Sequence, residues 1–209
     1  MVSLKYLTNM KKLLSLFCII CFYSAFNVSF AQELNEENYN PIYDRSEALL
    51  SNTDTIPDYK TKTNKLKLTG TIYMSDGVTP ASDVVLFIEQ ANEDGDFELR
   101  KTGDNRYVFH RSWVKTDADG NYTIYTFVPG NDRRYNQLQQ IFPIVKEPLK
   151  QEYQLETFLF DEDPLLTKRC RKRIKKKSDV TRILKLKQED GIFVAQRDII
   201  LASLEQKTK

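Results

Sequence analysis

The sequence predicts an all-β fold, an antiparallel β-sandwich, and two observations carry this prediction. From Lys65 to Leu201 the chain holds many short segments of strand-like texture, separated by turn-forming residues at close spacing. No stretch of this part shows the sustained apolar period of an amphipathic helix. Strands that follow one another in this way pack as sheets around one core. We therefore expect a single β-sandwich domain over residues 65–203.

The first 31 residues have the three parts of an export signal. Three lysines precede an apolar run over residues 13–31, and this run ends in the small-x-small cleavage pattern Ser29-Phe30-Ala31. Cleavage there would begin the mature chain near Gln32. The sequence therefore predicts a signal peptide at 1–31 and a protein that is exported, either periplasmic or secreted.

Loss of this signal would change both the charge and the cysteine count. Three of the 31 basic residues would leave with it and none of the 29 acidic residues, so the mature chain is expected to be close to neutral. Cys18 and Cys21 would leave as well, and Cys170 would remain alone. One cysteine can form neither an intrachain disulfide nor a thiolate metal cluster. The fold must then be stabilised by its core.

The segment at 32–64 is predicted to be a polar N-terminal arm. It contains Pro41 and Pro57 and shows no sustained period. Two arrangements stay open, because the arm could lie on the domain or act as a tether. The Ile-Pro-Asp sequence at 56–58 is the part that would dock it. At the other end of the chain, residues 204–209 are expected to form a polar tail.

The predicted sandwich begins with a strand at 65–73. Apolar residues or glycine occupy every second position from Leu66 to Ile72 and alternate with polar residues, so one face should be buried. The continuous apolar run at 84–88 suits a strand that is covered on both faces.

A hairpin is expected around the turn Asp117-Ala118-Asp119-Gly120, because its glycine accepts the positive φ that tight turns need. Strands at 107–116 and 122–127 would flank this turn. Further strands are predicted at 141–146, 153–160, 180–187 and 191–201.

Five motifs follow one another in a recognisable order between Lys65 and Leu201. In this order the sequence resembles the intradiol ring-cleavage dioxygenases of the catechol and protocatechuate type, especially a short secreted bacterial branch of that family. The motifs are Leu68-Thr69-Gly70-Thr71-Ile72-Tyr73 with Asp76-Gly77-x-Thr79-Pro80-Ala81, Trp113-Val114-Lys115-Thr116-Asp117-x-x-Gly120-x-Tyr122, Pro143-Ile144-Val145-Lys146-Glu147-Pro148, Phe160-Asp161-Glu162-Asp163-Pro164-Leu165-Leu166-Thr167 and Arg197-Asp198-Ile199-Ile200-Leu201.

The resemblance implies a ferric ion held by two tyrosinates and two histidines, a Lewis acid for a catecholate. In this sequence the two tyrosine positions fall on Phe97 and Asp132, and the two histidine positions fall on Gln140 and Phe142. The chain has one histidine, His110, and it belongs to a different strand. We therefore predict no metal ligands, no catalytic residues and no cofactor.

One alternative to this prediction remains. An active dioxygenase would need Fe(III), and Tyr135 is the residue that could replace a lost tyrosine. His110 is interpreted as a structural or surface histidine, because the spacing reveals no nucleophile with a supporting acid.

The vacated positions could still bind a small aromatic or polar ligand. Phe97 and Phe142 would supply aromatic faces, and Asp132 and Gln140 would supply polar anchors. Arg111 could line the same pocket, or it could be a cross-strand partner of an acidic residue. The alternative is that the former metal site has been repacked as core.

A run of basic residues occupies 168–177, where eight of ten residues are Lys or Arg. Lipid headgroups or acidic polysaccharide could contact it, and the alternative is a solvated connection between strands. We expect no nucleic-acid partner, because export is predicted and no aromatic residue interrupts the run for base stacking.

Three hypotheses for function follow. The first is an exported intradiol-dioxygenase-like domain that has lost its activity and acts as a small-molecule-binding or structural module, as a monomer or a homo-oligomer. The second is an active iron-dependent dioxygenase that cleaves catechol-like rings. The third is an adhesion or assembly module that uses a sheet and the basic run.

Overall fold

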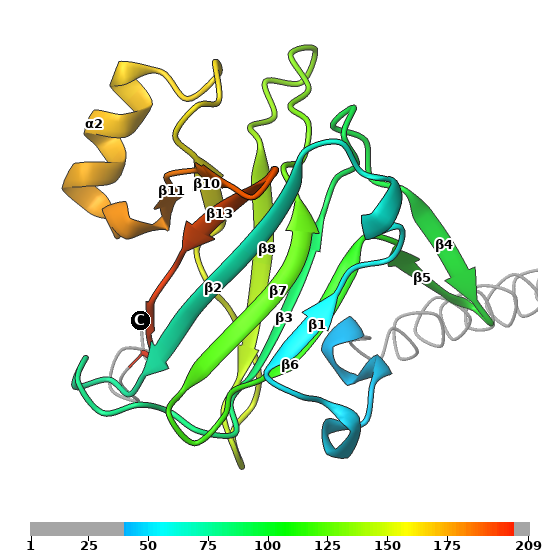
Figure 1. Cartoon of the computed structure of the whole chain (residues 1–209), viewed down its shortest axis with the longest axis vertical. Coiled ribbons are helices and arrows are strands. Elements are labelled where there is room, and N and C mark those ends of the chain that lie inside the picture. The colour runs from blue at the N-terminus through cyan, green and yellow to red at the C-terminus, as the bar shows by residue number, and fades with distance from the viewer. Residues whose placement is uncertain (1–39, 203–209) are drawn as a thin grey trace, which may run out of the picture. The chain divides into compact units, whose positions relative to one another are not determined.

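A computed structural model describes residues 40–202 of the chain (Figure 1). The predicted signal peptide at 1–31, the arm from 32 to 39, the domain end at 203 and the tail at 204–209 lie outside the described residues. Between residues 40 and 202, no helix is long and apolar enough to cross a membrane.

Two sheets of six strands each build the domain, and their strands are mostly antiparallel. In the first sheet β2 is central; it pairs antiparallel with β7 and parallel with β13 and β14. Its strands are β1 (Thr53–Thr55), β7 (Asn121–Phe127), β2 (Lys65–Tyr73), β13 (Ile192–Gln196), β12 (Lys187–Glu189) and β14 (Ile199–Ile200).

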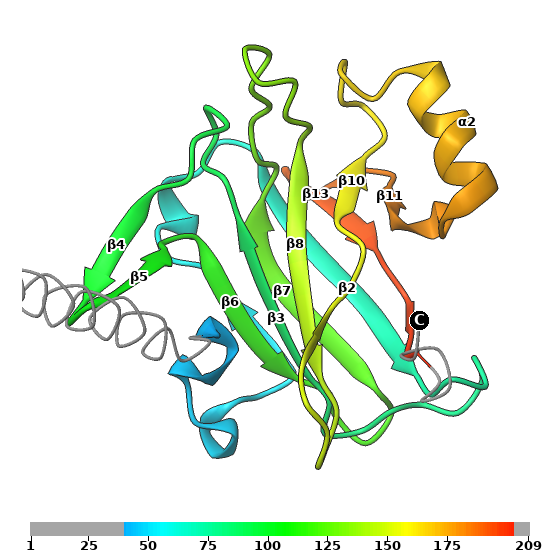
Figure 2. The same cartoon turned by 180° about the vertical axis from the view of Figure 1, so that it is seen from behind.

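The second sheet packs behind the first, as the view from behind shows (Figure 2). Its strands are β11 (Ile183–Leu184), β10 (Phe158–Phe160), β8 (Gln140–Lys146), β3 (Val85–Gln90), β6 (Arg111–Lys115) and β9 (Tyr153–Gln154), and a separate hairpin is formed by β4 (Leu99–Thr102) and β5 (Asn105–Val108). The predicted all-β sandwich is thereby confirmed.

The main core lies between the two sheets. Leu66, Leu68 and Ile72 of β2 are fully buried in it, as their alternation with polar residues predicts. Strand β3 is buried on both faces: its Leu86 and Ile88 belong to the main core, while Val85 and Phe87 belong to a second cluster on the outer face of the sheet. The prediction for residues 84–88 is confirmed.

The described part of the arm covers this outer cluster. Ile42, in the 3₁₀-helix η1 (Pro41–Asp44), packs against Phe87 and Trp113. The Trp113 indole N–H donates to the carbonyls of Pro41 and Ile42 at 3.2 and 3.1 Å. Two more short 3₁₀-helices and one strand complete this segment: η2 (Glu47–Leu49), β1 and η3 (Tyr59–Thr61). Residues 41–64 therefore lie on the domain.

The prediction of a hairpin around residues 117–120 is wrong, although the predicted turn is present. The Asp117 carboxylate accepts from the backbone N–H groups of Asp119 and Asn121, and Gly120 has φ +72°. The strands on either side belong to different sheets, because β6 pairs with β3 and β7 pairs with β1 and β2. The turn is an arch between sheets, and a tight turn of this chemistry fits either connection.

The expectation that the domain has no helix is also wrong. The basic run forms α2 (Lys168–Lys177), a mostly exposed helix in the connection between β10 and β11. Thr167 caps it by accepting from the Cys170 N–H at 3.2 Å, and Lys and Arg have good helix propensity. Its two residues that are not basic, Cys170 and Ile174, face the domain and pack on Leu159 and Leu166.

The predicted strand at 180–187 is shorter in the structure. The 3₁₀-helix η4 (Val180–Arg182) occupies its start, and only Ile183–Leu184 form β11, while Lys187 begins β12. The predicted segments at 153–160 and 191–201 each hold two short strands, β9 and β10 in the first and β13 and β14 in the second.

Candidate functional site

The candidate site lies on the outer face of the second sheet. Along β8, Ile141 and Val145 enter the main core, so Gln140 and Phe142 point to the other face, as the sequence predicts. The register places Phe142 opposite Glu89 of β3, and Glu89 opposite Arg111 of β6. Three neighbouring strands therefore bring these side chains into one row.

Phe97 lies against Phe142. Their ring centroids are 5.6 Å apart and the rings are tilted by 56°, a favourable aromatic geometry. The loop before Phe97 is held by Asn92, whose side-chain oxygen accepts from the N–H groups of Asp94 and Asp96. Two of the four positions that the resemblance assigns to metal ligands thus pack on each other.

The Asp132 carboxylate has its hydrogen-bond partners within its own loop. Its carboxylate accepts from the backbone and the guanidinium of Arg134, with contacts of 2.8 to 3.1 Å, and its backbone forms a bridge with Gln137. The hydrogen bonds from Arg134 hold the pKa of Asp132 below its usual value. Gln137 in turn donates to the carbonyl of Gly95, so this loop and the one before Phe97 are joined.

Arg111 is covered by the arm. Its guanidinium forms an ion pair with Asp44 of η1 and lies 3.8 Å from the ring centroid of Tyr107 and 4.8 Å from that of Trp113. Burial raises the pKa of the neighbouring Glu89, and the charge of Arg111 opposes this shift. Of the two roles left open, partner of an acidic residue fits Arg111, because it pairs with Asp44 of the arm and lies opposite Glu89 across the strands.

Gln140 opens into a different space. It lines a cleft of about 370 Å³ between α2 and the β8–β10 part of the sheet. The remaining lining residues are Leu138, Glu156, Thr157, Leu159, Leu166, Cys170, Arg173, Ile174, Lys177, Ser178 and Arg182. The structure therefore packs Phe97 on Phe142, joins the Asp132 loop to the loop before Phe97, and places Gln140 in the wall of the cleft.

A ferric ion does not fit these side chains. Phe97 and Phe142 carry no donor atom, and the Asp132 carboxylate is engaged by Arg134. Within residues 40–202, no group of three or more His, Cys, Asp or Glu side chains is arranged to hold a metal ion. Tyr135, the residue considered as a replacement ligand, is 80% exposed.

His110 lies between the sheets. Its ring is 5.1 Å from that of Phe127 in the first sheet, and it is 1% exposed. Neither ring nitrogen has a hydrogen-bond partner among the described residues, and burial lowers its pKa. The burial of this ring rules out the surface histidine that the sequence left open, while its structural role stays a prediction.

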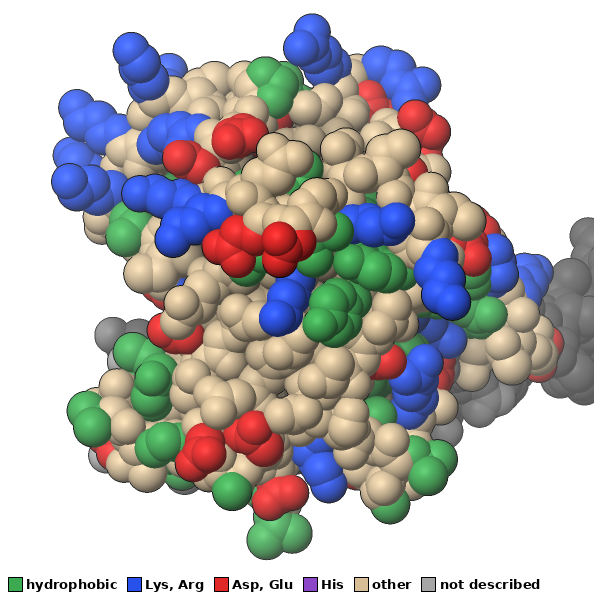
Figure 3. All heavy atoms as spheres, viewed as in Figure 1, with side chains coloured by type: hydrophobic (Ala, Val, Ile, Leu, Met, Phe, Trp, Pro, Cys, Tyr) green, Lys and Arg blue, Asp and Glu red, His purple; other side chains and the backbone are tan. Residues whose placement is uncertain are grey.

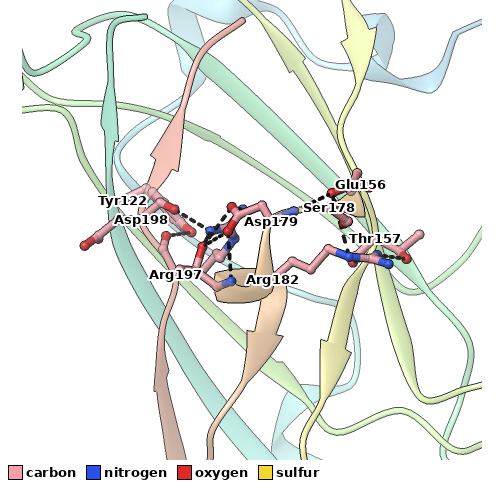
Figure 4. A network of polar contacts seen from close by, with 9 residues as sticks. Tyr122, Glu156, Thr157, Ser178, Asp179, Arg182, Arg197 and Asp198 are labelled. Carbon is pink, nitrogen blue, oxygen red and sulfur yellow. Dashed lines mark hydrogen bonds and ion pairs between the residues drawn. The ribbon is translucent and has the colours of Figure 1, made fainter. Parts of the chain in front are cut away.

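A polar network ties the C-terminal strands to η4 (Figure 4). Asp179, Thr181 and Arg197 of this network line a second cleft, of about 560 Å³, which is distinct from the one under α2. The Arg197 guanidinium is almost buried; it donates to Asp179 at 2.8 Å and also to Thr181 and the Asp198 carbonyl. The buried Tyr122 hydroxyl donates to the carbonyl of Arg197 at 2.6 Å. The Tyr122 and Arg197 motifs of the sequence thus meet across the fold.

Sequence reasoning singled out the basic run that holds Arg173 and Lys177, but it missed the cleft and the third cation, Arg182. The density of charge at 168–177 was the available signal. The position of the run over β10 was not visible, because only two apolar residues direct its packing.

The fold is that of the intradiol dioxygenases. The dioxygenase domain of a dioxygenase–carbohydrate-binding protein fusion from Streptomyces sp. SirexAA-E superposes with a TM-score of 0.56 at 18% identity, over 70% of this chain and 85% of that one. An intradiol ring-cleavage dioxygenase from Tetranychus urticae gives 0.53 at 14% identity, over 74% and 88%.

Catechol 1,2-dioxygenase from Acinetobacter sp. ADP1 gives a TM-score of 0.54 at 16% identity, with 74% of this chain and 58% of the enzyme covered. The chain thus spans little more than half of that enzyme. No family model and no curated protein matches the sequence. The resemblance drawn from the five motifs is confirmed at the level of the fold.

Proposed function

We propose that this chain is an exported, non-catalytic intradiol-dioxygenase-like domain that acts as a binding module. The observation that carries the proposal is the state of the four vacated positions. Phe97 and Phe142 pack on each other, Asp132 is paired with Arg134, and Gln140 faces another cleft. A ferric site of the family type needs phenolates and imidazoles at one point, and these residues offer neither.

The test combines iron binding with turnover. The purified mature protein is incubated with ferric ion, and iron content, the visible spectrum and oxygen uptake with catechol are measured beside a catechol 1,2-dioxygenase treated in the same way. We expect no stoichiometric iron, no tyrosinate-to-iron absorption band and no oxygen uptake. One iron per chain with ring cleavage would establish the alternative, an active dioxygenase.

Export is part of the proposal and has its own test. N-terminal sequencing of the protein recovered outside the cytoplasm should begin near Gln32. A chain that keeps Met1 would contradict cleavage of the predicted signal peptide.

A further inference from the structure

The exposed side of α2 is a continuous cationic stripe. Its five members recur at helical spacing and line a groove of about 200 Å³. They are Arg169, Lys172, Arg173, Lys176 and Lys177. In the space-filling view, Lys and Arg side chains gather at the edge of the molecule formed by α2 (Figure 3).

The charge of this stripe is not neutralised within the described domain. Of the eight cations of α2, Arg171 is paired, with Asp161; the other seven form no ion pair with a described residue. Like charges three and four residues apart destabilise a helix. The dipole also disfavours Lys168 and Arg169 in the first turn. A folded helix that keeps these charges together is suited to an anionic ligand.

The cleft beneath α2 continues the stripe, because Arg173 and Lys177 line both the groove and the cleft. The walls of the cleft combine aliphatic side chains with hydrogen-bonding groups, notably Gln140 and Ser178. A sugar ring presents an apolar C–H face and a hydroxyl edge, so it matches walls of this kind.

Arg182 adds a fixed cation to the cleft. Its Nη1 donates to the carbonyl and hydroxyl oxygens of Thr157 at 2.7 and 3.1 Å. Its Nε is buried and has no hydrogen-bond partner in the described chain. The one carboxylate of the cleft, Glu156, lies 3.8 Å from this Nε and accepts from Ser178, so it offsets part of the positive charge.

We propose that α2 and the cleft beneath it form a binding site for a linear acidic polysaccharide. Carboxylate or sulfate groups of successive sugars would contact the stripe, and one sugar ring would occupy the cleft. The inference deepens the proposed binding function and depends on it. A ligand of this class needs no metal, and a rigid row of cations orders its charges along one direction.

A lipid surface fits α2 less well. Both apolar side chains of the helix, Cys170 and Ile174, face the domain, so none is available to enter a bilayer. Nucleic acid is also disfavoured, because neither the groove nor the cleft is lined by an aromatic residue that could stack on a base.

The first experiment measures binding of the mature protein to polygalacturonate and to heparin at several salt concentrations. The triple variant Arg169→Gln/Lys172→Gln/Lys176→Gln should bind about tenfold more weakly and depend less on salt, because fewer counterions are released. Glutamine keeps the helix propensity. The matched control Lys101→Gln/Arg106→Gln/Lys187→Gln removes the same charge from exposed positions elsewhere and should bind like the wild type. Equal losses in both variants would overturn the proposal.

The second experiment tests the cleft. Gln140→Ala/Ser178→Ala should weaken binding of a short acidic oligosaccharide severalfold, while Gln188→Ala, on exposed β12, should not. Methyl-esterified polygalacturonate should not bind, because it lacks the charges. Tighter binding to phosphatidylglycerol vesicles than to either polysaccharide would overturn the proposal in favour of a lipid surface.

These outcomes are separate from those of the iron test. Failure to bind any acidic polysaccharide would remove this inference and leave the absence of iron chemistry untouched. Iron-dependent ring cleavage would remove the proposed function even if polysaccharide binding were observed.

Discussion

Two regions of the outer face of the second sheet are covered, one by the arm and one by α2. They differ in whether their polar groups have hydrogen-bond or ion-pair partners. Under the arm, Arg111 is paired with Asp44 and the Trp113 indole donates to backbone carbonyls. Under α2, a cleft stays open and seven cations above it have no described partner. The comparison shows a region closed by internal contacts beside one whose α2 cations, apart from Arg171, form no ion pair with the described residues.

Truncating a side chain should cost more stability in the region under the arm than in the region under α2. Trp113→Ala removes a buried indole that packs on Phe87 and Ile42, and we expect a loss of about 3–5 kcal/mol in the free energy of unfolding. Urea unfolding measures this loss. Tyr135→Ala, at an exposed position, is the control and should change stability by less than about 0.5 kcal/mol. A small effect of Trp113→Ala would mean that the arm does not close this face.

Phe97 and Phe142 occupy two of the positions that the resemblance assigns to metal ligands, and we expect them to behave as packed core. Phe97→Ala and Phe142→Ala should each cost about 1–3 kcal/mol, because both rings are only partly buried. A double-mutant cycle by urea unfolding should give a coupling of about 0.5–1.5 kcal/mol. Additive losses would indicate that the rings do not support each other and that an open pocket remains between them.

His110, between the sheets, should make the free energy of unfolding depend on pH. Burial lowers the pKa of His110 in the folded protein, so below about pH 6.5 the unfolded chain binds the proton more readily and the free energy of unfolding falls with falling pH. Asp76, Asp117 and Asp132, whose pKa values are lowered, add their own loss only in more acidic solution.

His110→Phe removes this titration. Between pH 7 and about 5 its stability should change less with pH than that of the wild type, as followed by thermal unfolding. The same slope in both proteins would contradict a histidine that is held neutral by burial.

The smallest change in the free energy of unfolding is expected at α2. At low salt, Arg169→Gln/Lys172→Gln/Lys176→Gln should raise the free energy of unfolding by a few tenths to about 1 kcal/mol, since several like-charge pairs are relieved. Added salt should stabilise the wild type more than the variant. A less stable variant would mean that these cations have partners inside the fold.

Sequence alone predicted the parts of this molecule that depend on local pattern. The alternation along β2, the doubly covered β3 and the outward direction of Gln140 and Phe142 all follow from the two-residue period of a strand. The order of the five motifs predicted the fold, because together these motifs span the domain.

What escaped prediction depends on long-range contacts. The turn at 117–120 has the same local chemistry in a hairpin and in an arch, so only the pairing of β6 with β3 decides between them. The helix α2 is held by two apolar residues, too few to show a period. That Gln140 lines the cleft under α2 also depends on a long-range contact, its pairing with Leu159 of β10.

The parallel pairing of β1 with β7 bears on the order in which the chain acquires its structure. Thr53 pairs with Thr123, and Asp54 accepts from the backbone of Trp113, so the arm finds its partners far along the sequence. Synthesis proceeds from the N-terminus, and residues 41–56 therefore emerge well before the strands that hold them. They stay without those contacts until β6 and β7 are made, and contacts of such sequence separation form slowly. Until then, Ile42 of the arm and Phe87 of β3 lack the contacts of their cluster and remain open to chaperones and to other chains.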